Sequence, residues 1–230
     1  LGLAGIPAAS EEVTVARDLI LSEKTGTHLH VCHVSTAGSV ALIRDALAKG
    51  VKVSAETAPH YFTLTDEAMQ PYDANFKMNP PLRSDNDRQA IIEGLRDGTL
   101  GVIATDHAPH ADYEKEQEIS YAPFGIVGLE TAVGLAVAEL VEKKVITVKD
   151  LVIRMSVNPA KILGLAGRGQ LGQGAAADVT VVDLNKEWVV DKTKFESKSR
   201  NTPFNGRKLK GEVWMTIVGG DVVFKDGKIL

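Results

Sequence analysis

The sequence predicts an α/β fold followed by a small all-β domain, and three observations support this prediction. Helical patterns alternate with short β-rich runs through the first two thirds of the chain. Strands that are separated by helices indicate parallel βαβ units. From Leu171 onward the sequence contains only strand patterns and turns. We therefore expect one domain at residues 1–166 and a second domain at residues 167–230.

The expected helices follow the spacing of apolar residues and the residues that start or stop a helix. Ser10 with the acidic residues after it marks a helix start. Gly50 is placed to end the second helix in a left-handed conformation. The predicted helices cover residues 10–21, 39–49, 66–69, 85–94, 131–143 and 147–163.

The expected strands are short and rich in β-branched residues. Those of the first domain cover residues 28–34, 51–56 and 101–106, and those of the second cover 178–183, 187–190, 211–218 and 221–224. Gly219-Gly220 and Asp226-Gly227 are typical of hairpin turns. An open sheet of three parallel strands would leave its edges uncovered. The sequence therefore predicts either a smaller α/β fold or one that lacks several strands at its front.

Composition excludes several classes of partner. The chain has 230 residues, 44% of them hydrophobic and 24% charged, with a formal net charge of −4. This balance is ordinary for a soluble globular protein and argues against nucleic acid or an anionic membrane as a partner. The single cysteine, Cys32, cannot form an internal disulfide. We therefore expect a reducing cytoplasm as the compartment.

The first candidate site is the histidine-rich run at the end of the first expected strand. Alternation along a strand places His28 and His30 on one face and His33 on the other. A histidine at a strand end can bind a metal ion through a neutral ring nitrogen. The alternative is that these are half-buried histidines that only form hydrogen bonds. Cys32 is interpreted as a small buried apolar residue, because no second thiol or base is placed to activate it.

The second candidate site follows the third expected strand, where Asp106 precedes His107 and His110. A carboxylate at a strand end can bind a metal ion and transfer protons. The alternative role of Asp106 is to cap the next segment.

The third candidate site is a proline-rich loop that contains Asn79. A rigidly held Asn amide can donate and accept hydrogen bonds, which suits an amide-like substrate. A stiff connector is the alternative. His60 follows the second expected strand, where a structural role competes with a role in lining a pocket. Gly125 permits close approach of the backbone to a ligand or to another segment.

Five motifs in order make the chain resemble the bacterial dihydroorotases, which are related to hydantoinases and allantoinases within the amidohydrolase superfamily. Their sequences are His-Val-Cys-His-Val-Ser-Thr (30–36), Glu-Thr-Ala-Pro-His (56–60), Lys-Met-Asn-Pro-Pro-Leu-Arg (77–83), Ala-Thr-Asp-His-Ala-Pro-His (104–110) and Ala-Pro-Phe-Gly-Ile-Val-Gly-Leu-Glu-Thr (122–131). The resemblance implies the C-terminal part of a (β/α)₈ barrel at residues 1–166 and a small, incomplete β-sandwich domain at residues 167–230.

The resemblance also implies roles for individual residues. His33 matches a metal ligand on the sixth barrel strand, and Asp106 matches a ligand of the other metal ion on the eighth strand that also acts as general acid and base. Asn79, His110 and the backbone amide of Gly125 match contacts to the substrate. The implied reaction is the zinc-dependent, reversible cyclisation of N-carbamoyl-L-aspartate to L-dihydroorotate in de novo pyrimidine biosynthesis. An allantoinase or hydantoinase activity is the alternative within the superfamily.

The family uses two Zn²⁺ ions per complete active site, and its other ligands are expected upstream of Leu1. The isolated chain should therefore bind zinc weakly and catalyse poorly. A truncated, non-catalytic scaffold is the second hypothesis for its function. We expect a homodimer as the assembly of the enzyme.

Overall fold

The computed structural model of the chain describes residues 2, 5–70 and 72–230. The chain divides into two compact units, Leu1–Glu130 with Asp191–Asn205 and Thr131–Val190 with Gly206–Leu230. The domain boundary expected between residues 166 and 167 falls within the second unit and stays a prediction. The expected boundary followed a change in composition, whereas the helices after residue 130 group with the strands that follow them.

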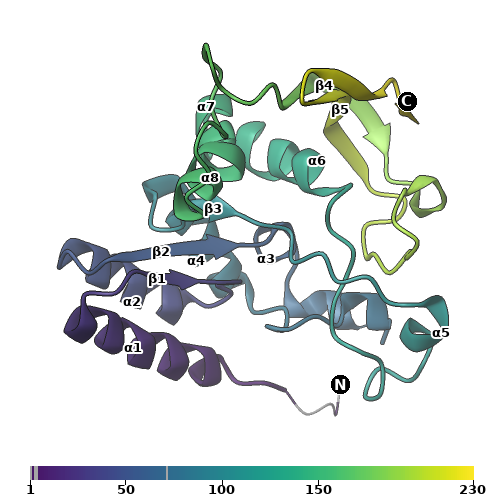
Figure 1. The fold of residues 1–230 in the computed structure, drawn as a ribbon. Coiled ribbons are helices and arrows are strands. Elements are labelled where there is room, and N and C mark those ends of the chain that lie inside the picture. The colour runs from purple at the N-terminus through teal and green to yellow at the C-terminus, as the bar shows by residue number, and fades with distance from the viewer. Residues whose placement is uncertain (1, 3–4, 71) are drawn as a thin grey trace. The chain divides into compact units, whose positions relative to one another are not determined.

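The first unit contains a three-stranded parallel sheet in the order β1-β2-β3 (Figure 1), so the predicted parallel βαβ arrangement is confirmed. Its strands are β1 (Leu29–Val31), β2 (Val53–Thr57) and β3 (Val102–Ile103). Its helices are α1 (Ala8–Thr25), α2 (Ala37–Ala48), α3 (Pro59–Thr63), η1 (Asp66–Met69), η2 (Ala74–Phe76), α4 (Asp85–Asp97) and α5 (Asp112–Lys115), and the 3₁₀ helix η5 (Lys192–Lys194) belongs to the returning segment.

Strand β2 buries one of its faces and carries polar side chains on the other. Along β2, Val53, Ala55 and Thr57 are buried, whereas Ser54 and Glu56 alternate with them on the partly open face. Helix α2 packs against α1, α4 and β2. Alternation therefore directs the polar side chains of β2 away from the apolar core.

Local capping residues set the helix boundaries. The Thr36 side chain accepts a hydrogen bond from the Ser39 amide at the start of α2, and Ser84 does the same for Asp87 at the start of α4. Gly26 ends α1 with a φ of 70°, and Gly50, which follows the C-cap residue Lys49 of α2, has a φ of 79°. Left-handed positions of this kind favour glycine because it has no Cβ.

Two predicted strands are shorter than expected. β1 ends at Val31 and β3 ends at Ile103, although the sequence pattern continues through residues 34 and 106. His33 and Asp106 have φ values of 55° and 48°, in the left-handed region that ordinary residues seldom adopt. The chain therefore leaves the sheet before each of these residues.

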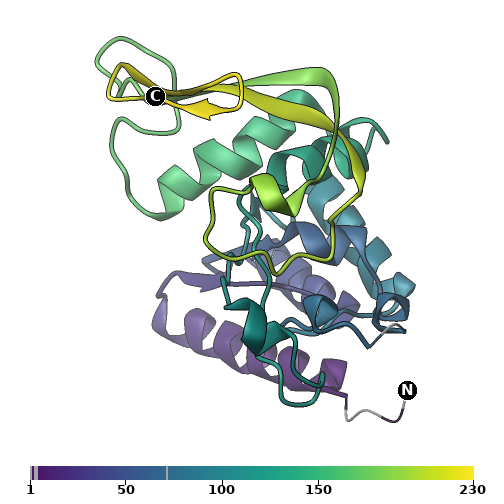
Figure 2. The ribbon, with the colours of Figure 1, turned by 90° about the vertical axis from the view of Figure 1, so that its right-hand side faces the viewer.

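The second unit contains a four-stranded antiparallel sheet in the order β4-β5-β6-β7, drawn in light green to yellow in Figure 2. Its strands are β4 (Val179–Val189), β5 (Lys208–Val218), β6 (Asp221–Lys225) and β7 (Lys228–Ile229), and its helices are α6 (Ala132–Ala136), α7 (Val148–Val152) and α8 (Asn158–Ile162), with the π-helical segments η3 (Val137–Val141) and η4 (Ile153–Val157). The hairpin turns predicted at Gly219-Gly220 and Asp226-Gly227 are confirmed. The two strands expected at 178–183 and 187–190 form one strand, β4, with an irregularity between Asp183 and Glu187.

Close approach of the α6 and η3 helical segment to β4 and β5 explains two glycines of this unit. A Cβ on Gly134 would lie 2.9 Å from the Trp188 ring, and a Cβ on Gly211 would lie 2.8 Å from Val137. The Trp188 indole donates a hydrogen bond to the Gly211 carbonyl at 3.0 Å. These contacts join the helical segment after residue 130 to the antiparallel sheet. Among the described helices, none is long and apolar enough to cross a membrane.

Candidate active site

The structure brings together the two residues that were predicted to bind metal. His33 lies two residues beyond β1, and Asp106 lies three residues beyond β3. The His33 Nε2 atom is 3.6 Å from Asp106 Oδ1, and their side chains are 32% and 26% exposed. Both residues have left-handed backbones. Backbone strain of this kind costs about 1–3 kcal/mol per residue and is concentrated at functional sites.

Glu56 links this pair to a second histidine, and no sequence pattern singled it out as a site residue. Its Oε1 atom is 3.3 Å from His33 Nδ1, and its Oε2 atom is 3.1 Å from His30 Nε2. His33 and His30 therefore approach one carboxylate, which corrects the expectation that they face opposite sides of a strand. The strand alternation stops at Val31, and the left-handed turn at His33 redirects its side chain.

His60 is a buried neutral histidine next to this pair. It is 2% exposed. Burial, with a smaller effect of the nearby His33, lowers the pKa of His60 to about 3. Its ring packs edge-on against Tyr61, and its Nε2 atom has no hydrogen-bond partner among the described residues. His60 therefore contributes no positive charge at neutral pH.

Cys32 is exposed, so the interpretation of it as a buried apolar residue is wrong. It lies directly after β1, where the chain turns out of the sheet. Partial desolvation and the negative charges of Glu56 and Asp106 raise the pKa of its thiol.

Asn79 lines a cavity of about 380 Å³ together with His30, Cys32 and Arg83. The Tyr61 hydroxyl donates to the Pro80 carbonyl at 2.7 Å, which fixes the proline-rich loop. Asn79 itself is exposed. No described hydrogen bond or ion pair joins it to His33 or Asp106.

His110 and Gly125 are held together in a second loop region. The His110 Nε2 atom is 2.8 Å from the Phe124 carbonyl, and the Asn201 amide donates to the carbonyls of Ala108 and Gly125. The Gly125 amide donates to the Lys77 carbonyl at 3.0 Å. This bond engages the same amide that the resemblance assigned to the substrate, and the contact of Gly125 with the substrate stays a prediction.

Two lysines fix the same loop region through main-chain carbonyls. Lys77 Nζ donates to the carbonyls of Ile119 and Ala122 at 2.6 Å. Lys115 Nζ donates to the carbonyls of Pro123 and Gly125 at 2.9 and 3.0 Å and to the Lys77 carbonyl at 3.3 Å. Lys115 is only 6% exposed, and burial, with a smaller effect of the Lys77 charge, lowers its pKa to about 8.

The spacing of His33 and Asp106 is compatible with ligands of one zinc-type ion or of two neighbouring ions, and the resemblance implies the second arrangement. Zinc bonds to imidazole nitrogen and carboxylate oxygen are about 2.0–2.2 Å long, so two ligands of one tetrahedral ion lie about 3.3 Å apart. The observed separation is 3.6 Å. Catalytic zinc takes about three protein ligands. The pair can therefore supply part of a metal site and hold a proton beside it.

The chain belongs to the amidohydrolase family, whose model matches residues 17–223. It is 59% identical over 226 residues to a dihydroorotase of Pelotomaculum thermopropionicum, with 98% of this chain and 53% of the relative covered. It is 54% identical over 230 residues to a dihydroorotase of Acetivibrio thermocellus, with 100% of this chain and 54% of the relative covered. The chain thus spans about half the length of the curated relatives it matches.

Solved structures give a consistent comparison. The chain superposes on an L-hydantoinase (dihydropyrimidinase) from Arthrobacter aurescens with a TM-score of 0.93 and 31% identity, covering 97% of this chain and 51% of the other. For a dihydropyrimidinase from Brevibacillus agri the TM-score is 0.92 and the identity 25%, covering 97% and 50%.

Proposed function

We propose that this chain is the C-terminal portion of a dihydroorotase, which interconverts N-carbamoyl-L-aspartate and L-dihydroorotate. The observation that carries the proposal is the pairing of His33 with Asp106 beyond the ends of β1 and β3, at 3.6 Å. An imidazole and a carboxylate at this spacing suit metal-assisted hydrolysis of a cyclic amide. The identities of 59% and 54% to dihydroorotases support the choice of substrate.

The fold that goes with this function is part of a (β/α)₈ barrel. In the proposal, β1, β2 and β3 are the sixth, seventh and eighth strands, and the four-stranded sheet belongs to a small β-sandwich domain. Support comes from the TM-scores to hydantoinases, of which the chain covers about half. In such barrels the active site lies at the C-terminal ends of the strands, which is the side on which His33 and Asp106 follow their strands.

The residues present would hold zinc through His33 Nε2 and the Asp106 carboxylate. When bound, the ion would polarise the ring carbonyl and lower the pKa of the attacking water. In the hydrolytic direction, the water oxygen bonds to the ring amide carbon and the carbon–nitrogen bond breaks. Asp106 accepts the proton of the water and delivers it to the departing nitrogen. Two zinc ions per complete site, as the resemblance implies, would need ligands beyond this pair.

Asn79, His110 and Gly125 are the proposed substrate-binding residues. The exposed amide of Asn79 can donate and accept hydrogen bonds, and the His110 ring can bind a carboxylate or carbonyl oxygen. Gly125 would contact the substrate through its backbone amide, which donates to the Lys77 carbonyl in this structure. The homodimer implied by the resemblance stays a prediction, and sedimentation of the purified protein would test it.

Hydantoinase or allantoinase activity is a second candidate, favoured by the likeness to the L-hydantoinase structure at 31% identity. A non-catalytic scaffold is a third candidate, and it has no need of the His33–Asp106 pair. An assay of the whole protein with dihydroorotate, hydantoin and allantoin separates these candidates. We expect dihydroorotate to be hydrolysed with the highest kcat/KM. Preference for hydantoin or allantoin would reassign the substrate, and loss of all three activities would favour the scaffold.

The same assay applied to the chain alone tests the expectation that it binds zinc weakly. We expect its activity and zinc content to be well below those of the whole protein, because the His33–Asp106 pair supplies too few ligands. Stoichiometric zinc retained by the isolated chain would contradict this expectation.

A further inference from the structure

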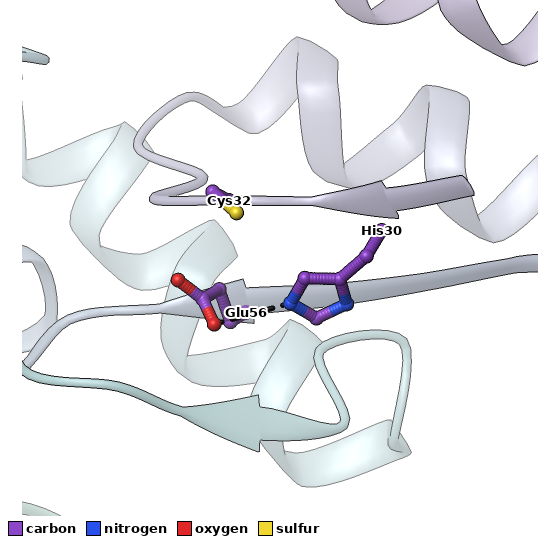
Figure 3. Close-up of side chains that lie close together, drawn as sticks. All are labelled: His30, Cys32 and Glu56. Carbon is purple, nitrogen blue, oxygen red and sulfur yellow. Dashed lines mark hydrogen bonds and ion pairs between the residues drawn. The ribbon is translucent and has the colours of Figure 1, made fainter. Parts of the chain in front are cut away.

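The register of β1 and β2 gathers three metal-ligating side chains on one face of the sheet. His30 pairs with Ser54 and Val31 with Ala55, so Cys32 follows beside Glu56. Figure 3 shows His30, Cys32 and Glu56 extending from the two neighbouring strands into one space. One ligand atom from each of these residues lies within 4.8 Å of the other two. We call these three residues the His30–Cys32–Glu56 cluster.

The cluster is accessible to solvent, but its ligand atoms are held in place. Cys32 is exposed, whereas the His30 and Glu56 side chains are 22% and 12% exposed. His30 and Cys32 also line the cavity of about 380 Å³. The His30 Nδ1 atom is 2.7 Å from Ser54 Oγ, which fixes the orientation of the ring. A small cation could therefore reach ligands whose positions are already restricted.

We propose that the His30–Cys32–Glu56 cluster is a binding site for a zinc-type divalent cation, with His30 Nε2, Cys32 Sγ and a Glu56 oxygen as ligands. Thiolate, imidazole and carboxylate together select zinc, cobalt and cadmium over magnesium and calcium. When the ion binds, the thiol proton leaves to solvent and a sulfur–metal bond forms. With the ion on Nε2, the His30 ring would carry its proton on Nδ1 and donate it to the Ser54 hydroxyl, as metal-bound histidines commonly do to a neighbouring acceptor.

The spacing within the cluster supports this assignment. The His30 Nε2 atom is 3.1 Å from Glu56 Oε2, close to the roughly 3.3 Å that separates two nitrogen or oxygen ligands of a tetrahedral zinc ion. Three protein ligands leave a fourth position open for water or another small ligand.

This site differs from the proposed catalytic pair, because it uses neither His33 nor Asp106. The two sites touch through Glu56, whose other oxygen is 3.3 Å from His33 Nδ1. An ion in the cluster would therefore compete with His33 for the same carboxylate. The test of this site does not depend on whether the chain is part of a dihydroorotase.

Titration of the metal-free 230-residue chain with Co²⁺ tests the inference. Because Cys32 is the only cysteine, a sulfur-to-cobalt charge-transfer band in the near ultraviolet reports binding at this residue. We expect the band in the unaltered chain and its loss in Cys32→Ser. We expect His30→Ala and Glu56→Gln to weaken Co²⁺ binding by about tenfold or more, since each removes a ligand.

Matched controls separate the cluster from nonspecific binding and from the catalytic pair. His28→Ala removes an exposed histidine outside the cluster, and Asp106→Asn removes a ligand of the other site. Both variants should keep the band and the Co²⁺ affinity, and circular dichroism should show that every variant is folded. A missing band in the folded, unaltered chain would overturn the inference. So would a band with unchanged affinity in His30→Ala and Glu56→Gln, or one that disappears in Asp106→Asn.

Discussion

The strand-end region around His33 and Asp106 contrasts with the loop region around Lys77 and Lys115. In the strand-end region, His33 Nδ1 lacks a well-aligned hydrogen bond although Glu56 is 3.3 Å away, and two residues have left-handed backbones. In the loop region, each lysine ammonium group donates to three carbonyl oxygens. Polar groups that are left unsatisfied are available for a ligand, whereas saturated ones stabilise the fold.

The largest expected effect follows from removing the charge of Asp106. Asp106→Asn in the whole protein should lower kcat/KM for dihydroorotate by about 10²- to 10⁴-fold, because the general acid and base is lost. The free energy of unfolding should change little, since the carboxylate is partly exposed and has His33 as its only ion-pair partner among the described residues. Steady-state kinetics and urea denaturation measure the two quantities.

Asp45→Asn is the matched control for this variant. Asp45 is an exposed carboxylate on α2 that pairs with Lys49, and such surface pairs contribute little to stability. Its kinetics should equal those of the unaltered protein. If Asp106→Asn retained full activity, the proposed catalytic pair would be refuted.

Removing the ammonium group of Lys115 should mainly lower the stability of the fold, whereas removing the Asp106 carboxylate should mainly lower activity. Lys115→Met leaves three carbonyl oxygens without this donor in a buried setting, which should lower the free energy of unfolding by about 3 kcal/mol. Urea denaturation of the chain measures the loss. Lys24→Met, at an exposed position in the last turn of α1, should change stability far less. If the two variants were equally stable, the hydrogen bonds of Lys115 would not stabilise the loop region, and the contrast with the strand-end region would be wrong.

Gly125 tests how tightly the loop region is packed. Its φ is 122°, and a Cβ there would lie 2.5 Å from the Ala108 Cβ. Gly125→Ala should therefore destabilise the chain by about 2 kcal/mol. Gly26→Ala shares a positive φ but meets no atom within 4 Å, so the difference between the two variants isolates the steric contact. If Gly125→Ala lowered the free energy of unfolding by less than Gly26→Ala, the loop would have to accommodate the added Cβ without strain.

The smallest expected effect is the pH dependence caused by His60. Its pKa is about 3 in the folded chain and about 6.5 when unfolded, so between these values the unfolded state binds more protons. The free energy of unfolding therefore loses nothing to His60 above pH 6.5. It decreases as the pH falls from 6.5 towards 3, by at most about 1.4 kcal/mol per pH unit. The His60 ring resonances should stay constant between pH 8 and 5. A titration of this ring with a midpoint near 6 would contradict the burial of His60.

The sequence correctly predicted the turns and helix ends that are determined by residues close to them in the chain. The turn glycines at 219 and 220 identified a hairpin that the structure contains, and Gly50 ends α2 as expected. The strand ends were placed too late because the apolar pattern continues past Val31, whereas the left-handed turn at His33 depends on surrounding structure. The domain boundary was placed by composition, which does not report that α6 packs against β5.

The candidate site was also predicted only in part, because some of its contacts join segments that are distant in the chain. The residue patterns pointed to the strand-end histidines and to Asp106, and only the resemblance to dihydroorotases selected His33 among the histidines. Glu56 was missed because its partners, His30 and His33, lie more than twenty residues away and are reached only through the parallel register. The exposure of Cys32 and the bond from the Gly125 amide to Lys77 likewise depend on contacts between distant segments. The register itself is set by the buried alternation of β2, which a sequence pattern shows only for one strand at a time.

The most direct test of the central claim is to locate zinc by anomalous scattering in crystals of the whole protein. We predict zinc within about 2.0–2.2 Å of His33 Nε2 and of an Asp106 carboxylate oxygen, as one ion or as two neighbouring ions. Zinc that is bound elsewhere, with neither His33 nor Asp106 among its ligands in an active enzyme, would contradict the assignment of this pair as the metal-binding part of the active site.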